Sequence, residues 1–253
     1  MGNFAKPLFA GVFLAMLLSL PARASSEQYS QCVAAIAVSP DDALKRALTW
    51  AERGGGAAAE HCAALALITL KRPAEAAARL DRMAQVQPGD ARNRATLYDQ
   101  AGNAWLLAGQ PQNAESSFSS ALALTPNDAD LLIDRASARG LRKDWKGAEA
   151  DLTQAYALNR ANPEILVLRA SARAAQGRKD EARADIDAAL ALNPIFPDAL
   201  VERGAMKLAA GDKIGARADW QQALTAAPGS AAAATARNYL SGLDASMNNT
   251  PSK

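Results

Sequence analysis

The sequence predicts an all-α protein in which pairs of antiparallel helices stack side by side. Of its 253 residues, 49% are apolar but only 5% are aromatic, and alanine is abundant. This composition favours thin, closely packed helices over sheets. A repeat of 34 residues runs along most of the chain, and within each repeat apolar residues recur at helical spacing in two segments separated by short breaks.

The first 24 residues have the layout of a secretory signal peptide. A positive charge at Lys6 precedes the apolar run Leu8–Leu20, and Ala22 and Ala24 form a small-residue cleavage site. This pattern predicts cleavage after Ala24 and a periplasmic or secreted protein with no membrane insertion after cleavage. An uncleaved membrane anchor is the alternative, although the apolar run is short against the ~20 residues that a spanning helix needs.

Removal of the predicted signal peptide leaves a neutral chain. The segment contains two basic residues, Lys6 and Arg23, and no acidic residue, so the 28 basic and 26 acidic residues of the full sequence become 26 of each. A formally neutral exported protein gives no reason to expect nucleic acid as a partner.

Residues 25–56 are predicted to form an N-terminal helical cap. A helix over 26–38 carries Cys32, and a second helix begins at Ser39 and ends at the glycine run Gly54–Gly56. That run follows a helix and lacks the Lys-Ser/Thr of a phosphate-binding loop, so it indicates a helix stop.

The two cysteines of the chain, Cys32 and Cys62, are predicted to form a disulfide, because an exported protein reaches an oxidising compartment. Closing this loop would stabilise the fold by ~3–4 kcal/mol in the chain-entropy model. Two buried free thiols are the alternative. The only histidine, His61, has no cluster of ligands around it, so neither a metal nor a cofactor is expected.

The 34-residue register defines four continuous helix pairs and one degenerate pair. The segments "ADLTQAYALN" (150–159) and "ADIDAALALN" (184–193) match at this step. The predicted repeats are 57–90 (degenerate, four residues out of phase with the next), 95–128, 129–162, 163–196 and 197–230. A capping helix is predicted over 231–244 and a disordered tail over 245–253.

With these residues the chain resembles the tetratricopeptide repeat family. Counted from 1 to 34, repeats of that family have small residues at positions 8, 20 and 27, a large apolar residue at 24 and proline at 32. In the four continuous repeats position 24 is Phe118, Leu152, Ile186 and Trp220. The resemblance implies a right-handed superhelical solenoid with a binding surface, and it implies no particular chemistry.

Charged residues recur at two positions where the family usually has apolar ones. Position 7 is arginine in three repeats whose position 23 is aspartate, which predicts the structural ion pairs Arg135–Asp151, Arg169–Asp185 and Arg203–Asp219. At position 11 stand Arg139, Arg173 and Lys207, for which no recurring acidic partner is evident. Neighbours satisfy these three irregularly, or they form a basic ladder for an anionic ligand.

The resemblance also implies that the first helices of successive repeats line a concave groove. Its candidate residues are Asp99, Asn103, Leu106, Ile133, Ser137, Val167, Ser171 and Val201, together with Arg139, Arg173 and Lys207. Acidic residues, Asp130, Glu164 and Asp198, would form one edge. The alternative for several of these residues is packing between neighbouring helices.

The functional hypothesis is a non-catalytic periplasmic scaffold that recruits a peptide or helix of a partner protein. A structural or self-associating envelope component is the alternative, and an accessory subunit of an enzyme is a more distant one. Catalysis is not expected, because a nucleophilic triad needs a histidine or equivalent base and His61 has no Ser/Asp motif around it. The sequence does not identify the partner or the oligomeric state.

Overall fold

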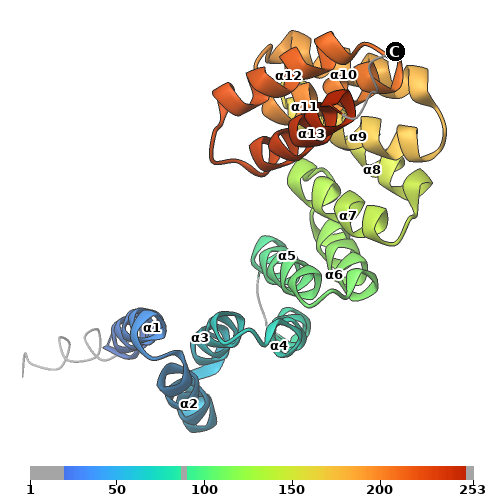
Figure 1. The fold of residues 1–253 in the computed structure, drawn as a ribbon. Coiled ribbons are helices and arrows are strands. Elements are labelled where there is room, and N and C mark those ends of the chain that lie inside the picture. Colours follow the sequence, from blue (N-terminus) through green and yellow to red (C-terminus); the bar gives the residue numbers. More distant parts are fainter. Residues whose placement is uncertain (1–19, 87–89, 249–253) are drawn as a thin grey trace, which may run out of the picture. The chain divides into compact units, whose positions relative to one another are not determined.

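The computed structural model describes residues 20–86 and 90–248, with side chains from Ser25 to Ala245. These residues form helices joined by short turns and contain no β-strand, which confirms the predicted all-α class. The chain divides into two compact units, residues 1–110 and 111–253, which follow one another along the colours of Figure 1. Residues 1–19 of the predicted signal peptide lie outside the described residues.

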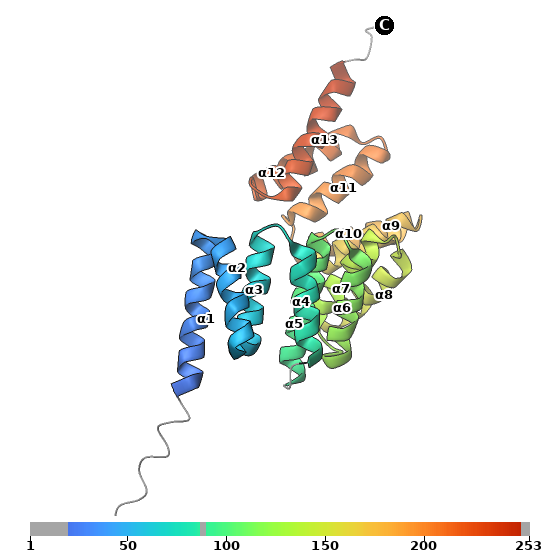
Figure 2. The ribbon, with the colours of Figure 1, turned by 90° about the horizontal axis from the view of Figure 1, so that it is seen from below.

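Unit 1 contains helices that pack against their neighbours in chain order, as Figure 2 shows in a view from below that of Figure 1. Alanines such as Ala43, Ala47 and Ala63 are almost fully buried between them, so the helix axes can approach closely. The elements are α1 (Leu20–Val38), α2 (Pro40–Trp50), a short π-helical turn η1 (Ala51–Gly55), α3 (Gly56–Thr69), α4 (Pro73–Val86) and α5 (Ala91–Leu107).

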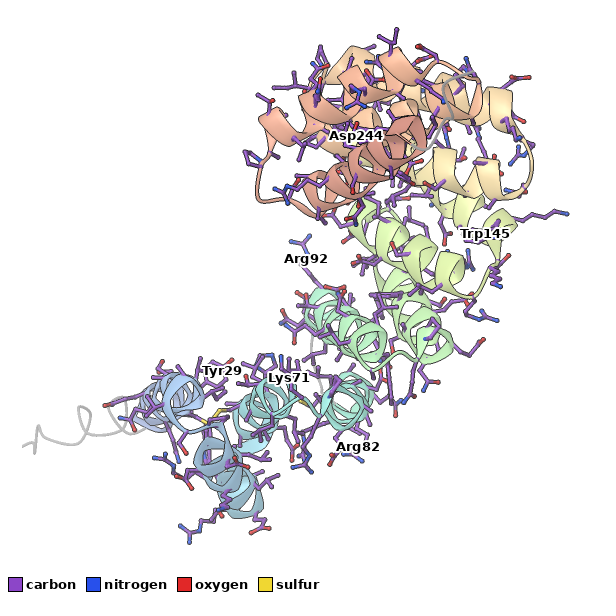
Figure 3. All side chains as sticks on the ribbon, in the orientation of Figure 1. Tyr29, Lys71, Arg82, Arg92, Trp145 and Asp244 are labelled. Atoms are coloured by element: carbon purple, nitrogen blue, oxygen red, sulfur yellow. A yellow bond between two sulfur atoms is a disulfide. The ribbon has the colours of Figure 1, made fainter. Side chains whose placement is uncertain are left out.

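A disulfide joins Cys32 of α1 to Cys62 of α3, with their Cα atoms 6.3 Å apart. Figure 3 draws it as a yellow bond beside Tyr29. Cys62 is fully buried and Cys32 is half-buried. The bond therefore ties the N-terminal cap to the first predicted repeat.

The glycine run ends α2 by changing the direction of the chain. Gly54 and Gly56 have φ angles of +90° and +55°, which non-glycine residues rarely adopt. A Cβ on Gly55 would lie 2.5 Å from the Trp50 ring, so a side chain there would displace the indole. At the other end of α2 the Ser39 hydroxyl donates to Asp42 instead of capping the helix.

Unit 2 contains three predicted helix pairs and the helices that flank them. Its boundary with unit 1 follows Gln110 and divides the predicted repeat 95–128, so α5 belongs to unit 1 and α6 to unit 2. The elements are α6 (Pro111–Leu124), α7 (Ala129–Leu141), α8 (Trp145–Leu158), α9 (Pro163–Ala175), α10 (Lys179–Leu192), α11 (Pro197–Ala209), α12 (Lys213–Ala226) and α13 (Ala231–Asn248).

The turn between the two helices of each predicted repeat contains one residue with a positive φ. The φ angles lie between +60° and +87°. These residues are all at position 15, and the first of them keeps the four-residue phase difference of the degenerate repeat. They are Lys71, Gly109, Lys143, Gly177 and Gly211.

Small residues make the close helix contacts in unit 2. Alanines at positions 20 and 27, such as Ala182 and Ala189, have no exposed surface. The largest buried side chain, Trp220, is accommodated by a glycine, because a Cβ on Gly204 would lie 2.4 Å from Nε1 of the indole. That nitrogen donates to the carbonyl oxygen of Val201 at 3.2 Å.

Helix α13 covers the last helix pair. Tyr239 stacks on Trp220 with 5.0 Å between ring centroids, and Leu243 is buried. The helix ends at Asn248, so 245–248 are helical where the sequence predicted a disordered tail. No glycine or proline interrupts these four residues, and nothing stops the helix before Asn248. The rest of the predicted tail, 249–253, lies outside the described residues.

Among the residues that the structure describes, no helix combines the length and the apolar character needed to cross a membrane.

Candidate functional site

The predicted groove residues fall into an accessible group and a buried pair. Val167 and Val201 have only 7% and 5% of their surface exposed. They pack into the core of unit 2, which corrects the prediction that they face a ligand. The remaining uncharged and acidic candidates are exposed or half-buried: Asp99, Asn103, Leu106, Ile133, Ser137 and Ser171.

Three of these candidates lie on α5 in unit 1. The side-chain amide of Asn103 donates to the Asp99 carboxylate at 2.9 Å and to the Asp99 carbonyl oxygen at 3.2 Å. Leu106 is half-buried on the same helix. The polar pair therefore forms a bridge within one helix face, which a ligand would have to compete with.

Small polar residues lie on the first helix of two helix pairs in unit 2. Ser137 on α7 and Ser171 on α9 donate their hydroxyls to the carbonyl oxygens of Ile133 and Val167, at 3.0 and 3.1 Å. Each bond spans one turn of its own helix, which leaves the hydroxyl oxygen free to accept from a partner. This surface can accommodate a backbone at short range, because its side chains are small.

The charged side chains at positions 7 and 23 meet inside each of the three helix pairs α7–α8, α9–α10 and α11–α12, as predicted. In the first pair the Arg135 guanidinium donates from Nη2 and Nε to the Asp151 carboxylate oxygens, at 2.7 and 2.9 Å. Such a two-point contact fixes both side chains in one geometry. The same bidentate contact joins Arg169 to Asp185, at 2.7 and 3.0 Å, and Arg203 to Asp219, at 2.8 and 2.9 Å.

The basic residues at position 11 bind the same aspartates. Nη1 of Arg139 is 2.7 Å from Asp151, and Nη1 of Arg173 is 2.8 Å from Asp185. Nζ of Lys207 is 2.8 Å from Asp219.

This regular pairing corrects the view that position 11 lacks a recurring acidic partner, and it contradicts a free basic ladder. Residues four apart lie on one helix face, so both cations of a pair such as Arg135 and Arg139 reach one carboxylate. That carboxylate offsets their mutual repulsion. We call each shared aspartate with its two cations an aspartate clamp.

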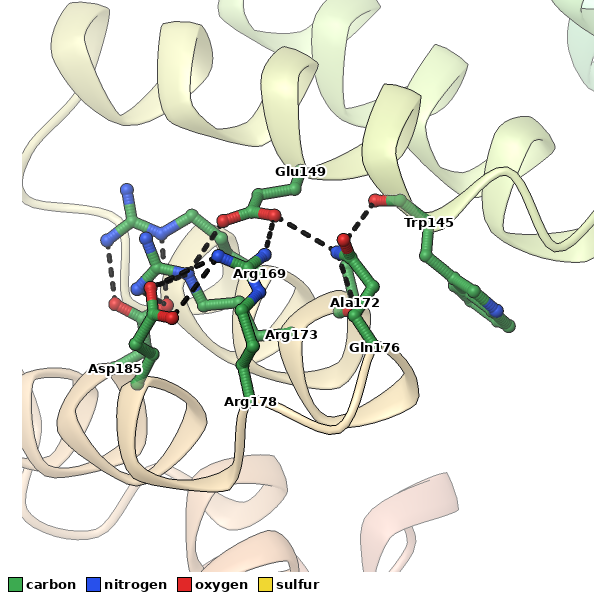
Figure 4. A network of polar contacts seen from close by, with 9 residues as sticks. Trp145, Glu149, Arg169, Ala172, Arg173, Gln176, Arg178 and Asp185 are labelled. Atoms are coloured by element: carbon green, nitrogen blue, oxygen red, sulfur yellow. Dashed lines mark hydrogen bonds and ion pairs between the residues drawn. The ribbon is translucent and has the colours of Figure 1, made fainter.

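Two of the three clamps extend to the preceding helix pair. Nε of Arg139 donates to Glu115 of α6 at 3.0 Å, and Nε of Arg173 donates to Glu149 of α8 at 3.0 Å. Figure 4 shows the second bridge, where the carboxylate of Glu149 also accepts from Gln176 at 3.0 Å. The 24-residue step from glutamate to arginine was visible in the sequence, but no family position pointed to it.

The third clamp has no such bridge. At the position of Glu115 and Glu149 stands Arg183, an exposed residue of α10. The side chains of Arg203 and Lys207 are each 32% exposed, whereas the four cations of the other two clamps are 11–20% exposed. The clamp nearest the C-terminus is thus the most accessible to water.

Burial and pairing act in opposite directions on the pKa of the Asp219 carboxylate. Burial alone would raise the pKa of Asp219, but the hydrogen bonds from Arg203 and Lys207 outweigh it and hold that pKa below its ordinary value. The hydrogen bond to Asp219 in turn raises the pKa of Arg203. The Asp219 carboxylate is therefore ionised at neutral pH.

Acidic residues lie in the first turns of α7, α9 and α11, the first helix of each helix pair in unit 2. Asp130, Glu164 and Asp198 are exposed at the second residue of their repeats, one each on α7, α9 and α11. One turn further along α11, burial raises the pKa of Glu202, and the nearby charge of Asp198 raises it further. Carboxylates at a helix N-terminus stabilise the helix by interacting with the positive end of its dipole. They can also attract basic groups of a partner.

His61 takes part in a polar contact between helices of unit 1. Its Nδ1 is 2.7 Å from the Tyr29 hydroxyl, and its Nε2 is 2.8 Å from Oε1 of Gln100. Both ring nitrogens are therefore engaged by other side chains of unit 1. Within residues 20–86 and 90–248, no group of three or more histidine, cysteine, aspartate or glutamate side chains could hold a metal ion.

No protein-family model and no curated protein sequence matches the chain significantly. Solved structures resemble it at low sequence identity. MamA 41-end from Desulfovibrio magneticus RS-1 is 19% identical, with a TM-score of 0.55 over 66% of this chain and 93% of that one. YrrB, described as a TPR protein with an unusual peptide-binding site, is 22% identical, with a TM-score of 0.52 over 75% of this chain and 96% of that one.

A larger protein is also similar in structure at low sequence identity. A monomeric mutant of IFIT1 with Gppp-AAAA is 14% identical, with a TM-score of 0.61 over 73% of this chain and 45% of that one. Likeness at these identities concerns the fold alone. Together with the 34-residue register, it shows that the chain has the tetratricopeptide repeat fold.

Proposed function

We propose that the chain is a non-catalytic scaffold that binds a segment of a partner protein on α7, α9 and α11, the first helix of each helix pair in unit 2. The carrying observation is the internal neutralisation of the basic side chains on these helices. Arg139, Arg173 and Lys207 are each engaged by a buried aspartate. The first turns of α7, α9 and α11 expose Asp130, Glu164 and Asp198, and small residues, Ser137, Ser171 and Ala205, follow them.

The accessible residues favour a partner segment that carries basic side chains. Asp130, Glu164 and Asp198 stand at equivalent positions of three successive helices, so a basic segment could meet them one after another. Ser137 and Ser171 are small, and they let a backbone approach. At the other end of α7, Leu141 is 65% exposed and offers an apolar contact.

The fold supports this proposal by analogy. Tetratricopeptide repeats present extended concave surfaces to partners, and YrrB is described as having a peptide-binding site. For the site of action we propose the periplasm or the exterior of the cell. The signal-peptide layout of residues 1–24 and the Cys32–Cys62 disulfide support export.

Site-specific photo-crosslinking in cells tests the proposal. A photoreactive phenylalanine analogue replaces Ser171 on the proposed surface or, as matched control, Thr153, which is exposed on the second helix α8. We expect a discrete protein adduct from position 171 only. Changing Asp130, Glu164 and Asp198 to lysine should abolish it, because like charges then repel the basic segment.

Equal adducts from both positions, or none from 171, would contradict the proposed surface. An adduct of twice the chain's own mass would instead favour the self-associating alternative.

A further inference from the structure

A hollow between α1 and α2 belongs to unit 1 and shares no residue with the proposed partner surface, which belongs to unit 2. It consists of two adjoining parts with volumes of about 140 and 340 Å³. Both parts are lined by Gln28 of α1 and by Arg46 and Trp50 of α2. The hollow is therefore continuous along the facing sides of the two helices.

Helical periodicity explains why these side chains share the hollow. On α1, Gln28, Gln31 and Ala35 follow one another at one-turn spacing. On the α2 side, Arg46, Trp50 and Arg53 do the same. The hollow is thus elongated along α2 and not a compact pit.

The lining of the larger part is basic. It contains Lys45, Arg46 and Arg53 and no acidic side chain. Asp42 contacts two of these cations: its carboxylate lies 3.8 Å from Nζ of Lys45, and its backbone carbonyl oxygen accepts from Nε of Arg46 at 3.3 Å. The ion pair is exposed on both sides and therefore weak, and the terminal nitrogens of Arg46 remain available.

The indole wall of the hollow depends on the glycine turn. Trp50 lies against the backbone of Gly55, where a Cβ would be 2.5 Å from the ring. Gly54 and Gly56 bend the chain on either side with positive φ angles. The missing side chain of Gly55 thus leaves room for the indole, which lines the hollow together with the three cations.

We propose that this hollow binds an extended acidic peptide segment. Arg46 of α2 and Arg53 of η1 are seven residues apart, which corresponds to about 10 Å at the rise of an α-helix. In a polyproline II segment, side chains three residues apart point the same way and are about 9 Å apart. Two glutamates at this spacing can each meet one guanidinium, while the residues between them pack on Trp50.

An isolated small anion fits the hollow less well. A single phosphate or carboxylate spans only a few ångströms, so it would engage one of the two arginines and leave the indole uncovered. The length of the lining and its aromatic centre together favour a chain segment over a compact anion.

Fluorescence anisotropy with a defined probe tests this proposal. The probe is a fluorescein-labelled peptide containing Glu-Pro-Pro-Glu, titrated with the purified chain with its disulfide intact at low salt. The double variant Arg46→Gln, Arg53→Gln should weaken binding by at least roughly tenfold, because each change removes a charge-assisted contact. Arg82→Gln is the matched control, since Arg82 is an exposed arginine on α4 of the same unit (Figure 3).

A second variant guards against misfolding of the first. Thr49→Glu adds a carboxylate within the lining and should also weaken binding, without removing either arginine. A Gln-Pro-Pro-Gln peptide should not bind. No saturable binding of the acidic probe, or equal affinity of all variants, would overturn the proposal. So would displacement of the probe by inorganic phosphate at the probe's own concentration, which would indicate a phosphate site.

The acidic-segment site does not depend on the proposed partner surface, because it uses only residues of unit 1. Changes at Asp130, Glu164 and Asp198 should leave probe binding unaltered, so either proposal can fail alone.

Discussion

The two units are both built from short antiparallel helices, but different bonds hold them. In unit 1 a disulfide joins α1 to α3, and the repeat 57–90 has Ala63 at position 7 and Arg79 at position 23. Arg79 pairs with Glu60, so the charges are exchanged between the helices. Unit 2 contains no cysteine and has an aspartate clamp in each of its three complete helix pairs.

The difference indicates that the same packing of antiparallel helices can be combined either with a disulfide between helices or with buried ion pairs. A buried ion pair is weak evidence for net stability, because desolvation opposes the attraction. It does fix the register of two helices, since an arginine and an aspartate meet bidentately in one geometry only. We interpret the clamps as register devices for repeats whose alanine-rich contacts are otherwise interchangeable.

Loss of the disulfide should have the largest effect, and it should be confined to unit 1. Replacing Cys32 and Cys62 by serine opens a loop with a sequence separation of 30. The free energy of unfolding should fall by about 3.5 kcal/mol, because the unfolded chain gains conformational entropy. Hydrogen exchange resolved by peptide would measure it. Protection should fall in α1 to α3 and stay unchanged in α8 to α12. An equal loss of hydrogen-exchange protection in both units would contradict the view that the disulfide stabilises unit 1 alone.

Removal of one clamp carboxylate should cost nearly as much, in unit 2. Asp185→Ala leaves Arg169 and Arg173 without their shared partner and should lower the free energy of unfolding by about 3 kcal/mol, as measured by urea denaturation. Asp187→Ala, at an exposed position of the same helix, is the control and should cost about 0.5 kcal/mol or less. Similar small losses for both variants would show that the clamp does not hold the pair.

Acid should weaken unit 2 through the Asp219 carboxylate of the third clamp. The folded pKa of Asp219 is below its ordinary value, so its contribution is complete above the unfolded pKa of about 3.9. It is lost as the pH falls through the lowered folded pKa. We expect the melting temperature to drop below about pH 4. Asp219→Asn should flatten that drop, and an unchanged acid limb would argue against an ionised clamp.

The smallest predicted change is a gain. Arg183 occupies the place of the bridging glutamates Glu115 and Glu149, so Arg183→Glu should give Lys207 a second carboxylate. Because the pair would be partly exposed, we expect a stabilisation of about 0.5 kcal/mol, seen as a raised urea midpoint. The reciprocal change Glu149→Arg should destabilise. A loss from Arg183→Glu would mean that the bridge does not transfer to the third clamp.

The sequence was sufficient for the helix pairs because backbone spacing and small residues repeat at one step. Arg135 and Asp151 could be paired in advance, since both charges appear or disappear together among the repeats. The second cation was missed because each aspartate had been assigned a single partner, although a carboxylate has two oxygens that accept several hydrogen bonds.

Burial was the other quantity that the sequence did not provide. Val167 and Val201 occupy positions that face a groove in the family, yet in this chain they fill space in the core of unit 2. Side-chain volume on the neighbouring helices decides such cases, and a one-dimensional pattern does not contain it. The hollow beside Trp50 was missed for a similar reason, because Gly54–Gly56 indicated only a helix end.

The aspartates of the three clamps bind the position 11 cations, which therefore do not form a free basic surface. A double-mutant cycle with Arg173→Ala and Asp185→Ala tests this claim most directly, with the free energy of unfolding as the measured quantity. We predict a coupling energy of about 1.5–3 kcal/mol between the two side chains. Additive effects, with a coupling energy near zero, would contradict the claim.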